Sequence, residues 1–258
     1  MSTSVAALLR TNQMRVLNAE SAKGFIIIID DKYVLKFTLI SQEYRDFPDI
    51  NKFSTSMFEY QTEANEQQRA YALCKVCPQI LCTLVLENAK SLDYFWNISK
   101  RCKRDANSFC THVFNQLQEI YQLSPELKCG IIVMPFVQGV LYKDTKPWEL
   151  NKRRQIIANC IKNVIKLYYK ANRIHSDLHE TNIIIEPNTL DCKFIDFGIM
   201  EIVEPNASSP PQTQAALVKF LNIMEPWLEF LSGDPIVYSG GTKRVYDPDF
   251  LRMCLSKR

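Results

Sequence analysis

Residues 174–198 read IHSDLHETNIIIEPNTLDCKFIDFG, and this stretch predicts more about the chain than the rest of the sequence does. Asp177 lies five positions before Asn182, and three isoleucines follow. A turn containing Pro187 separates them from a second apolar run, which leads to Asp196. We therefore expect two short strands joined by a turn, with polar side chains at the ends of the pair. A carboxylate that accepts a proton, with an amide and a second carboxylate that bind metal ions, is the set that phosphoryl transfer from ATP requires.

The spacing of these residues resembles two motifs of the protein-kinase-like superfamily. His175, Asp177 and Asn182 follow the pattern H-x-D-x-x-x-x-N, and Asp196 begins a D-F-G triplet. The resemblance implies an α+β, two-lobed kinase fold that uses ATP and Mg²⁺, with Asp177 as the catalytic base and Asn182 and Asp196 as metal ligands. His175 is then expected to brace the loop by packing and hydrogen bonding. The small size and the reduced C-terminal part are similar to the divergent, compact kinases of large DNA viruses, which implies a viral protein.

Two charged positions in the N-terminal half fit the same resemblance. Lys36 is the lone lysine of an apolar strand candidate that resembles the V-A-I-K strand, so it is expected to hold the ATP phosphates. A helix is expected over residues 54–77, and we assign Glu63 as the partner of Lys36, with Glu66 as the rival one turn later. Without the resemblance, the same pattern also fits a lysine that points outward from the strand. Either glutamate would then be an ordinary surface residue.

The adenine and phosphate contacts are expected from backbone groups. Met134 would lie beside the adenine, Pro135 would offer its carbonyl, and Val137 would offer its N–H and carbonyl, because an adenine edge needs a donor and an acceptor. Taken alone, the segment also reads as a buried strand that ends at a proline. The loop that should cover the phosphates is poor in glycine, since residues 18–24 contain only Gly24.

The order of predicted elements divides the chain into two lobes. We expect an N-lobe over residues 1–137, with an insert at about 88–128, and a mostly helical, shortened C-lobe over residues 138–258. The predicted strands cover residues 25–29, 33–37, 80–86, 130–137 and the two runs after 182, and the predicted helices cover 5–9, 54–77, 107–123, 150–171 and 212–231.

Composition limits the classes of function. The 258 residues are 47% hydrophobic, which permits one sizeable core or two smaller ones. The net charge of +3 gives no reason to expect nucleic acid or a membrane as a partner. Nine scattered cysteines are read as packed, reduced thiols, although Cys74 and Cys77 have zinc-like spacing. We therefore expect an intracellular, cytoplasmic protein, or a host-cytoplasm or virion protein if it is viral.

Two departures inside the opening stretch bear on the substrate. Ser176 stands where regulated protein kinases carry an arginine, so no activating phosphorylation is expected. His179 replaces the lysine of Asp-Leu-Lys and resembles the loops of lipopolysaccharide, choline and aminoglycoside kinases; it could contact the transferred phosphate as a donor. The favoured function is an atypical serine/threonine kinase that phosphorylates an unknown protein. The alternatives are a small-molecule or sugar kinase and a pseudokinase that acts as a binding scaffold.

Overall fold

The structure is a computed structural model that describes residues 14–17, 24–41, 54–86, 128–205, 208–231, 234, 237–239 and 245–256. By their internal contacts these residues form two units. The first takes in the described residues up to Ala64 and those between Gln79 and Phe136, and the second takes in residues 65–78 and everything from Val137 onward. The predicted helices at 5–9 and 107–123, the glycine-poor stretch 18–23 and nearly all of the predicted insert lie outside the described residues.

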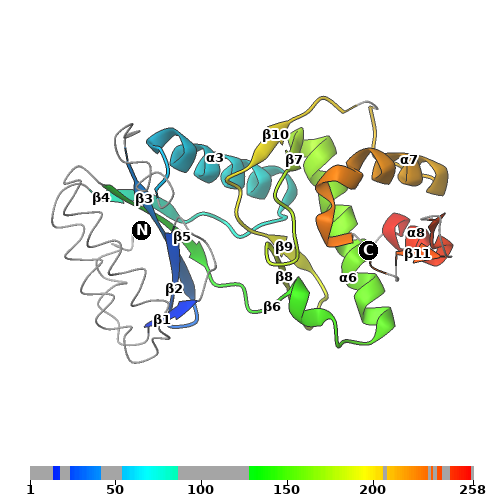
Figure 1. The fold of residues 1–258 in the computed structure, drawn as a ribbon, viewed down its shortest axis with the longest axis horizontal. Coiled ribbons are helices and arrows are strands. Elements are labelled where there is room, and N and C mark those ends of the chain that lie inside the picture. The colour runs from blue at the N-terminus through cyan, green and yellow to red at the C-terminus, as the bar shows by residue number, and fades with distance from the viewer. Residues whose placement is uncertain are drawn as a thin grey trace. The chain divides into compact units, whose positions relative to one another are not determined.

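The first unit is built on a five-stranded antiparallel sheet with the strand order β1-β2-β3-β5-β4 (Figure 1). A tight turn joins β2 to β3, and both of its central residues, Asp30 and Asp31, have positive φ angles of 52° and 48°. Aspartate tolerates this left-handed conformation, which suits the twist of a hairpin. The predicted hairpin is confirmed. The strands are β1 (Met14–Leu17), β2 (Gly24–Ile29), β3 (Tyr33–Ile40), β4 (Cys82–Leu86) and β5 (Lys128–Pro135).

Strand alternation divides the first unit into two apolar clusters. Leu35 and Phe37 of β3 pack with Ile131 on one face of the sheet. Residues with even numbers in β3 and β5 point to the other face, where Ile132 packs against Tyr60 of the helix α3. The Tyr60 hydroxyl donates to the carbonyls of Leu84 and Ile131, at 3.0 and 2.9 Å.

Gly130 allows that close approach of the helix to the sheet. A Cβ atom at this position would lie 2.6 Å from the Tyr60 ring and 2.9 Å from the Ile40 side chain. A larger residue would therefore displace one of the two, so the glycine is needed for packing at this point of β5.

Helix α3 (Met57–Cys74) begins and ends with recognisable caps. Ser56 Oγ accepts from the Glu59 N–H, and the Glu59 carboxylate accepts in return from the Ser56 N–H. This reciprocal pair is a capping box. The helix stops because Lys75 adopts a left-handed φ of 58°, three residues before Pro78. The predicted helix is confirmed, shorter by three residues at each end.

The second unit is organised around helix α6 (Leu150–Lys166), which continues as a π-helical turn over Leu167–Ala171. In Figure 1, α6 lies between the small strands on one side and α7 and α8 on the other. Its apolar stripe, including Ile157 and Ile161, is fully buried. The strands are β6 (Val140–Leu141), β7 (Arg173–His175), β8 (Ile183–Ile185), β9 (Cys192–Phe194), β10 (Met200–Ile202), β11 (Tyr238–Ser239) and β12 (Val245–Tyr246).

Two C-terminal expectations were wrong. The predicted helix over 212–231 is instead α7 (Gln214–Met224) followed by 3-10 turns at Glu225–Trp227 and Glu229–Leu231. Pro226 has no N–H to donate, so the α-helical hydrogen bonding cannot continue through this position. No helix was predicted after residue 231, but the structure has α8 (Pro248–Leu255), which buries Phe250, Leu251 and Cys254.

The cysteines in the described part of the chain are free thiols, and all but Cys82 are buried. Cys74 and Cys77 donate to the carbonyls of Lys166 and Gln67, both at 3.3 Å. Burial raises the pKa of Cys77 to about 12, so it remains a protonated thiol near neutral pH. Among the described residues there is also no helix long and apolar enough to span a bilayer.

Candidate active site

The loop between β7 and β8 holds Asp177 and Asn182 together. The Asn182 side chain is buried, and its Nδ2 donates to the Asp177 carbonyl at 2.8 Å and lies 3.3 Å from Asp177 Oδ2. The Asn182 N–H donates to the His179 carbonyl at 3.0 Å and closes the turn. The Asp177 carboxylate is 41% exposed, so it can meet a reactant while its backbone is fixed. The structure thus brings these two predicted residues together.

His175 braces the segment that carries Asp196. Its Nε2 donates to the Ile195 carbonyl at 3.0 Å, and its ring packs edge-on against Phe197 with 5.0 Å between centroids. Burial lowers the pKa of His175 below 6.5, and the imidazole is 3% exposed. A neutral, buried ring of this kind supports the loop and has no access to a substrate proton, in agreement with the role expected for it.

Asp196 lies directly beside the loop that carries Asn182. The Ile195 N–H donates to the Asn182 carbonyl at 3.0 Å, so the residue before Asp196 is tied on both sides, by His175 and by Asn182. Asp196 itself has a left-handed φ of 64°, which turns the chain sharply before Gly198. A non-glycine residue in this conformation is uncommon and often found at functional sites.

The donor set at this place suits Mg²⁺. A carboxylate from Asp196 and the amide oxygen of Asn182 are hard oxygen ligands, and Mg²⁺ in phosphoryl-transfer sites takes its other ligands from phosphates and water. Among the described residues there is no cluster of three or more His, Cys, Asp or Glu side chains that could form a complete protein cage. Asn182 and Asp196 are therefore the residues that would hold the metal, with phosphate and water as its other ligands.

Ser176 is tied to the strand that follows the metal-binding loop. Its N–H donates to the Ile199 carbonyl at 3.0 Å, and its hydroxyl donates to Glu201 Oε1 at 2.6 Å. The indole N–H of Trp227 donates to the same oxygen at 3.0 Å. Glu201 therefore joins the loop that begins at Ser176, β10 and the turn after α7 through two neutral donors.

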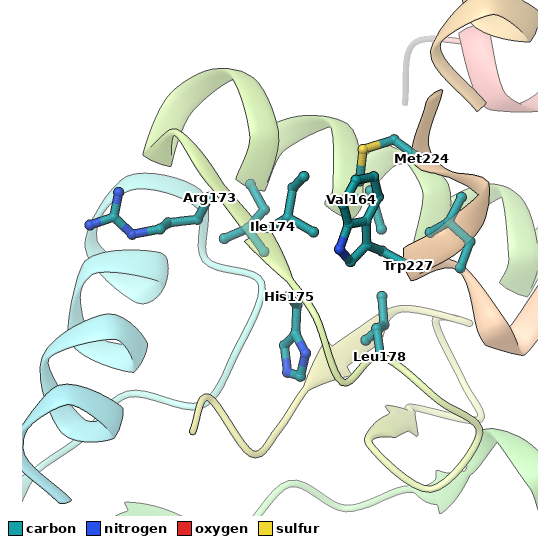
Figure 2. Close-up of a pocket in the computed structure, with 9 residues that line it drawn as sticks. Val164, Arg173, Ile174, His175, Leu178, Met224 and Trp227 are labelled. Atoms are coloured by element: carbon teal, nitrogen blue, oxygen red, sulfur yellow. The ribbon is translucent and has the colours of Figure 1, made fainter. Parts of the chain in front are cut away.

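The strand β7 is also tied to α3 through a residue that sequence reasoning missed. Arg173 donates to both carboxylate oxygens of Glu66, at 2.7 and 2.9 Å. Figure 2 shows the Arg173 guanidinium turned toward α3 and away from a small pocket that His175, Leu178 and Trp227 line. The pocket lining is mainly apolar, so we assign it to the packing behind the catalytic loop. The sequence contained one signal for Arg173, because a charged residue stands at the start of an apolar strand and needs a partner there.

Within the first unit, Lys36 pairs with Glu63. The two side chains are 16% and 10% exposed, and Lys36 Nζ lies 2.5 Å from Glu63 Oε1. Lys36 has an even number in β3, so it faces the side of the sheet that α3 covers. The structure therefore separates the two rivals: Glu63 pairs with the lysine, and Glu66 pairs with Arg173.

The structure also places the backbone groups that were assigned to adenine and phosphate. Met134 is buried on the α3 face of β5 and faces Val34, and Pro135 is the last residue of that strand, as predicted. Val137 begins the described part of the second unit after the strand. Gly24 is the first residue of β2 and pairs with Thr38. Their roles toward ATP stay predictions.

Comparisons with known proteins found one matching family model and several similar structures. The family model of the RIO domain, an atypical protein kinase family, matches residues 113–210. No curated protein sequence shows a significant match to the chain.

Similar solved structures include two of WbdD, one at high resolution and one described as a bifunctional kinase-methyltransferase. They are 14% and 13% identical with TM-scores of 0.43 and 0.42, and the matches cover 80% and 81% of this chain but 36% and 37% of theirs. A third is the PK-1 kinase of Cydia pomonella granulovirus, 12% identical with a TM-score of 0.40, covering 77% of this chain and 55% of that one. The chain thus spans about a third to a half of the length of these proteins.

The likeness to kinases is seen in the sequence motifs and in the contacts that their residues make in the structure. Asp177, Asn182 and Asp196 are brought to one place, Lys36 is paired with a helix glutamate, and the RIO domain model matches the chain across the catalytic segment. The chain is thus similar to the protein-kinase-like superfamily over residues 113–210, which the RIO domain model matches, and its described residues have an α+β fold.

Proposed function

We propose that the chain is an ATP-dependent phosphotransferase, and specifically an atypical serine/threonine kinase that transfers the γ-phosphate of ATP to hydroxyl groups of a protein. The observation that carries the proposal is the hydrogen-bonded group of Asp177 and Asn182, with Asp196 joined to it through the Ile195 N–H. This is the set of groups that phosphoryl transfer uses.

Each of these residues has a chemical role in the proposal. The exposed carboxylate of Asp177 accepts the proton of the attacking hydroxyl and orients its oxygen toward the phosphate. Asn182 and Asp196 would hold Mg²⁺, which when bound would supply positive charge beside the phosphate oxygens. Lys36, kept extended by Glu63, holds the α- and β-phosphates. Met134, Pro135 and Val137 supply the adenine contacts in this proposal, and the backbone at Gly24 approaches the phosphates.

The acceptor class separates the protein-kinase proposal from its alternative. The Asp177-Leu-His179 sequence favours the alternative, a small-molecule or sugar kinase. Against it, α7 and α8 bury their apolar faces in the core of the second unit, which supports a protein acceptor held outside that core. A pseudokinase would not need an exposed Asp177 or a Lys36–Glu63 pair.

Transfer of label from [γ-³²P]ATP distinguishes the three functions. The full chain is incubated with Mg²⁺ and either casein, aminoglycosides or choline, beside an Asp196→Asn preparation purified in the same way. Label on casein or on the chain itself, absent from the Asp196→Asn preparation, is the expected result. Label on a small molecule alone would replace the protein-kinase proposal with the small-molecule one, and equal label in both preparations would overturn the phosphotransferase proposal.

A further inference from the structure

His179 lies between Asp177 and Asn182 in the chain, and both nitrogens of its ring contact the loop. Nε2 lies 3.0 Å from Asn182 Nδ2, and Nδ1 lies 2.9 Å from Thr181 Oγ1. The ring is 33% exposed, and Nε2 is 3.7 Å from the nearer Asp177 oxygen, beyond hydrogen-bond distance. The side chain is therefore used within the loop, whereas the sequence led us to expect that it could donate to the transferred phosphate.

The contacts of Asn182 determine which way its amide group faces. Its nitrogen carries two hydrogens, and three acceptors lie near it: the Asp177 carbonyl at 2.8 Å, His179 Nε2 at 3.0 Å and, farther away, Asp177 Oδ2 at 3.3 Å. If the amide were turned over, its oxygen would face the Asp177 carbonyl, and two acceptors would repel each other. The nitrogen is consequently directed into the loop, and Oδ1 is the atom left for a metal ion.

The same contacts determine the tautomer of His179. Because Nε2 accepts from Asn182, the ring proton is on Nδ1, from which it is donated to Thr181 Oγ1. The Thr181 N–H also points at Nδ1, at 3.3 Å, and this longer contact is unfavourable when Nδ1 carries the proton. The opposite tautomer would satisfy that longer contact, but it would place two N–H donors against each other at 3.0 Å. Thr181 thus holds the ring in the tautomer that can accept from Asn182.

We propose that His179 is a positioning residue for the metal site, which orients the Asn182 amide so that its oxygen is presented to Mg²⁺. The inference rests on the proposed function, in which Asn182 is a metal ligand. Ligand-orienting partners of this kind commonly affect metal affinity by about 10- to 100-fold. A lysine could not replace His179 in this role, because an ammonium group has three donors and no acceptor.

Nucleotide affinity with and without the metal tests this role directly. The affinity of the full chain for a fluorescent ATP analogue is measured in excess Mg²⁺ and in EDTA. His179→Leu removes the acceptor, whereas His179→Gln retains one at a similar distance from the backbone. Thr181→Val keeps the shape of the side chain but loses the hydroxyl that sets the tautomer. Thermal unfolding of every variant shows whether it is folded, and the exposed position of the ring favours folding.

We expect His179→Leu to weaken binding in Mg²⁺ by about 10-fold or more, with unchanged binding in EDTA, and His179→Gln to remain within about threefold of wild type. Thr181→Val should fall between them. Unchanged Mg²⁺-dependent binding in both His179→Leu and Thr181→Val would overturn the inference, as would an equal loss in EDTA. If the wild-type chain binds the analogue equally in Mg²⁺ and EDTA, the proposed function itself is wrong, and this result is distinct from the other two.

Discussion

Glu63 and Glu66 lie on one helix but form ion pairs with different residues. They lie three positions apart, which places them on neighbouring parts of the surface of α3. Lys36 approaches Glu63 from β3, and Arg173 approaches Glu66 from β7. Helical spacing alone could not assign the partners, because both glutamates were within reach of the strand lysine. The alternation of β3, which sets Lys36 on the α3 face, was readable from the sequence.

Substitution of each glutamate by glutamine should therefore have different effects. Glu63→Gln removes the charge that holds Lys36, so we expect kcat/KM for ATP to fall by up to about 100-fold with little change in unfolding. Glu66→Gln weakens the two charged hydrogen bonds from Arg173 and should lower the free energy of unfolding by roughly 1.5–3 kcal/mol. ATP-dependent kinetics and urea unfolding of both variants provide the measurement. Identical profiles for the two variants would contradict separate roles.

His175 should make stability depend on pH in the acidic range. Burial lowers its pKa in the folded chain below 6.5, so between that lowered pKa and 6.5 the unfolded chain binds more protons than the folded chain. The free energy of unfolding contributed by this residue is complete above pH 6.5 and decreases as the pH falls toward the folded pKa. Urea unfolding of wild type and His175→Gln across this range provides the test. The variant should lose less stability on acidification, and equal slopes would count against the assignment.

At the scale of elements, α8 shows a signal that was present but missed. Asp247 Oδ1 accepts from the N–H groups of Asp249 and Phe250, and Pro248 occupies the first turn. An aspartate followed by proline and a spaced apolar set is a typical helix start. The segment follows a polar stretch that contains Gly240 and Gly241, and no helix was predicted there.

The cap of α8 can be tested by a single substitution. Asp247→Ala should lower the free energy of unfolding by about 1 kcal/mol, the usual value for loss of an N-cap, whereas Asp247→Ser keeps an acceptor and should cost less. Arg154 also approaches this carboxylate at 3.6 Å, so part of any loss in the alanine variant reflects that ion pair. No change in the denaturation midpoint of Asp247→Ala would show that the helix does not depend on its cap.

In the catalytic segment, the sequence predicted features that depend on neighbouring residues, but it did not predict contacts between residues far apart in the chain. The strands β8 and β9 and the spacing from Asp177 to Asn182 follow from neighbouring residues, and they were predicted. The link from Ser176 to Glu201 and Trp227 joins positions 25 and more residues apart, and nothing in the local pattern indicates it. The partners of Ser176 were therefore visible only in the structure.

At the scale of the whole molecule, the Ser176–Glu201–Trp227 link predicts activity without phosphorylation. Treatment with a broad-specificity phosphatase, followed by its removal, should leave the rate of phosphoryl transfer unchanged. Glu201→Ala should lower the rate, because Ser176 and Trp227 lose their common acceptor, and Glu201→Gln should retain most of it. A phosphatase-treated chain that is inactive until phosphorylated again would contradict this prediction.

The central claim is that Asp177 performs phosphoryl transfer in a protein-kinase-like fold, and Asp177→Asn tests it most directly. Asparagine retains the shape and an oxygen for the contact with Asn182 Nδ2, but it cannot accept the hydroxyl proton. Transfer from [γ-³²P]ATP and affinity for the nucleotide are measured on the same preparations. We expect transfer to fall by about 10²- to 10⁴-fold while nucleotide affinity stays within about threefold. Equal transfer by wild type and Asp177→Asn would contradict the account.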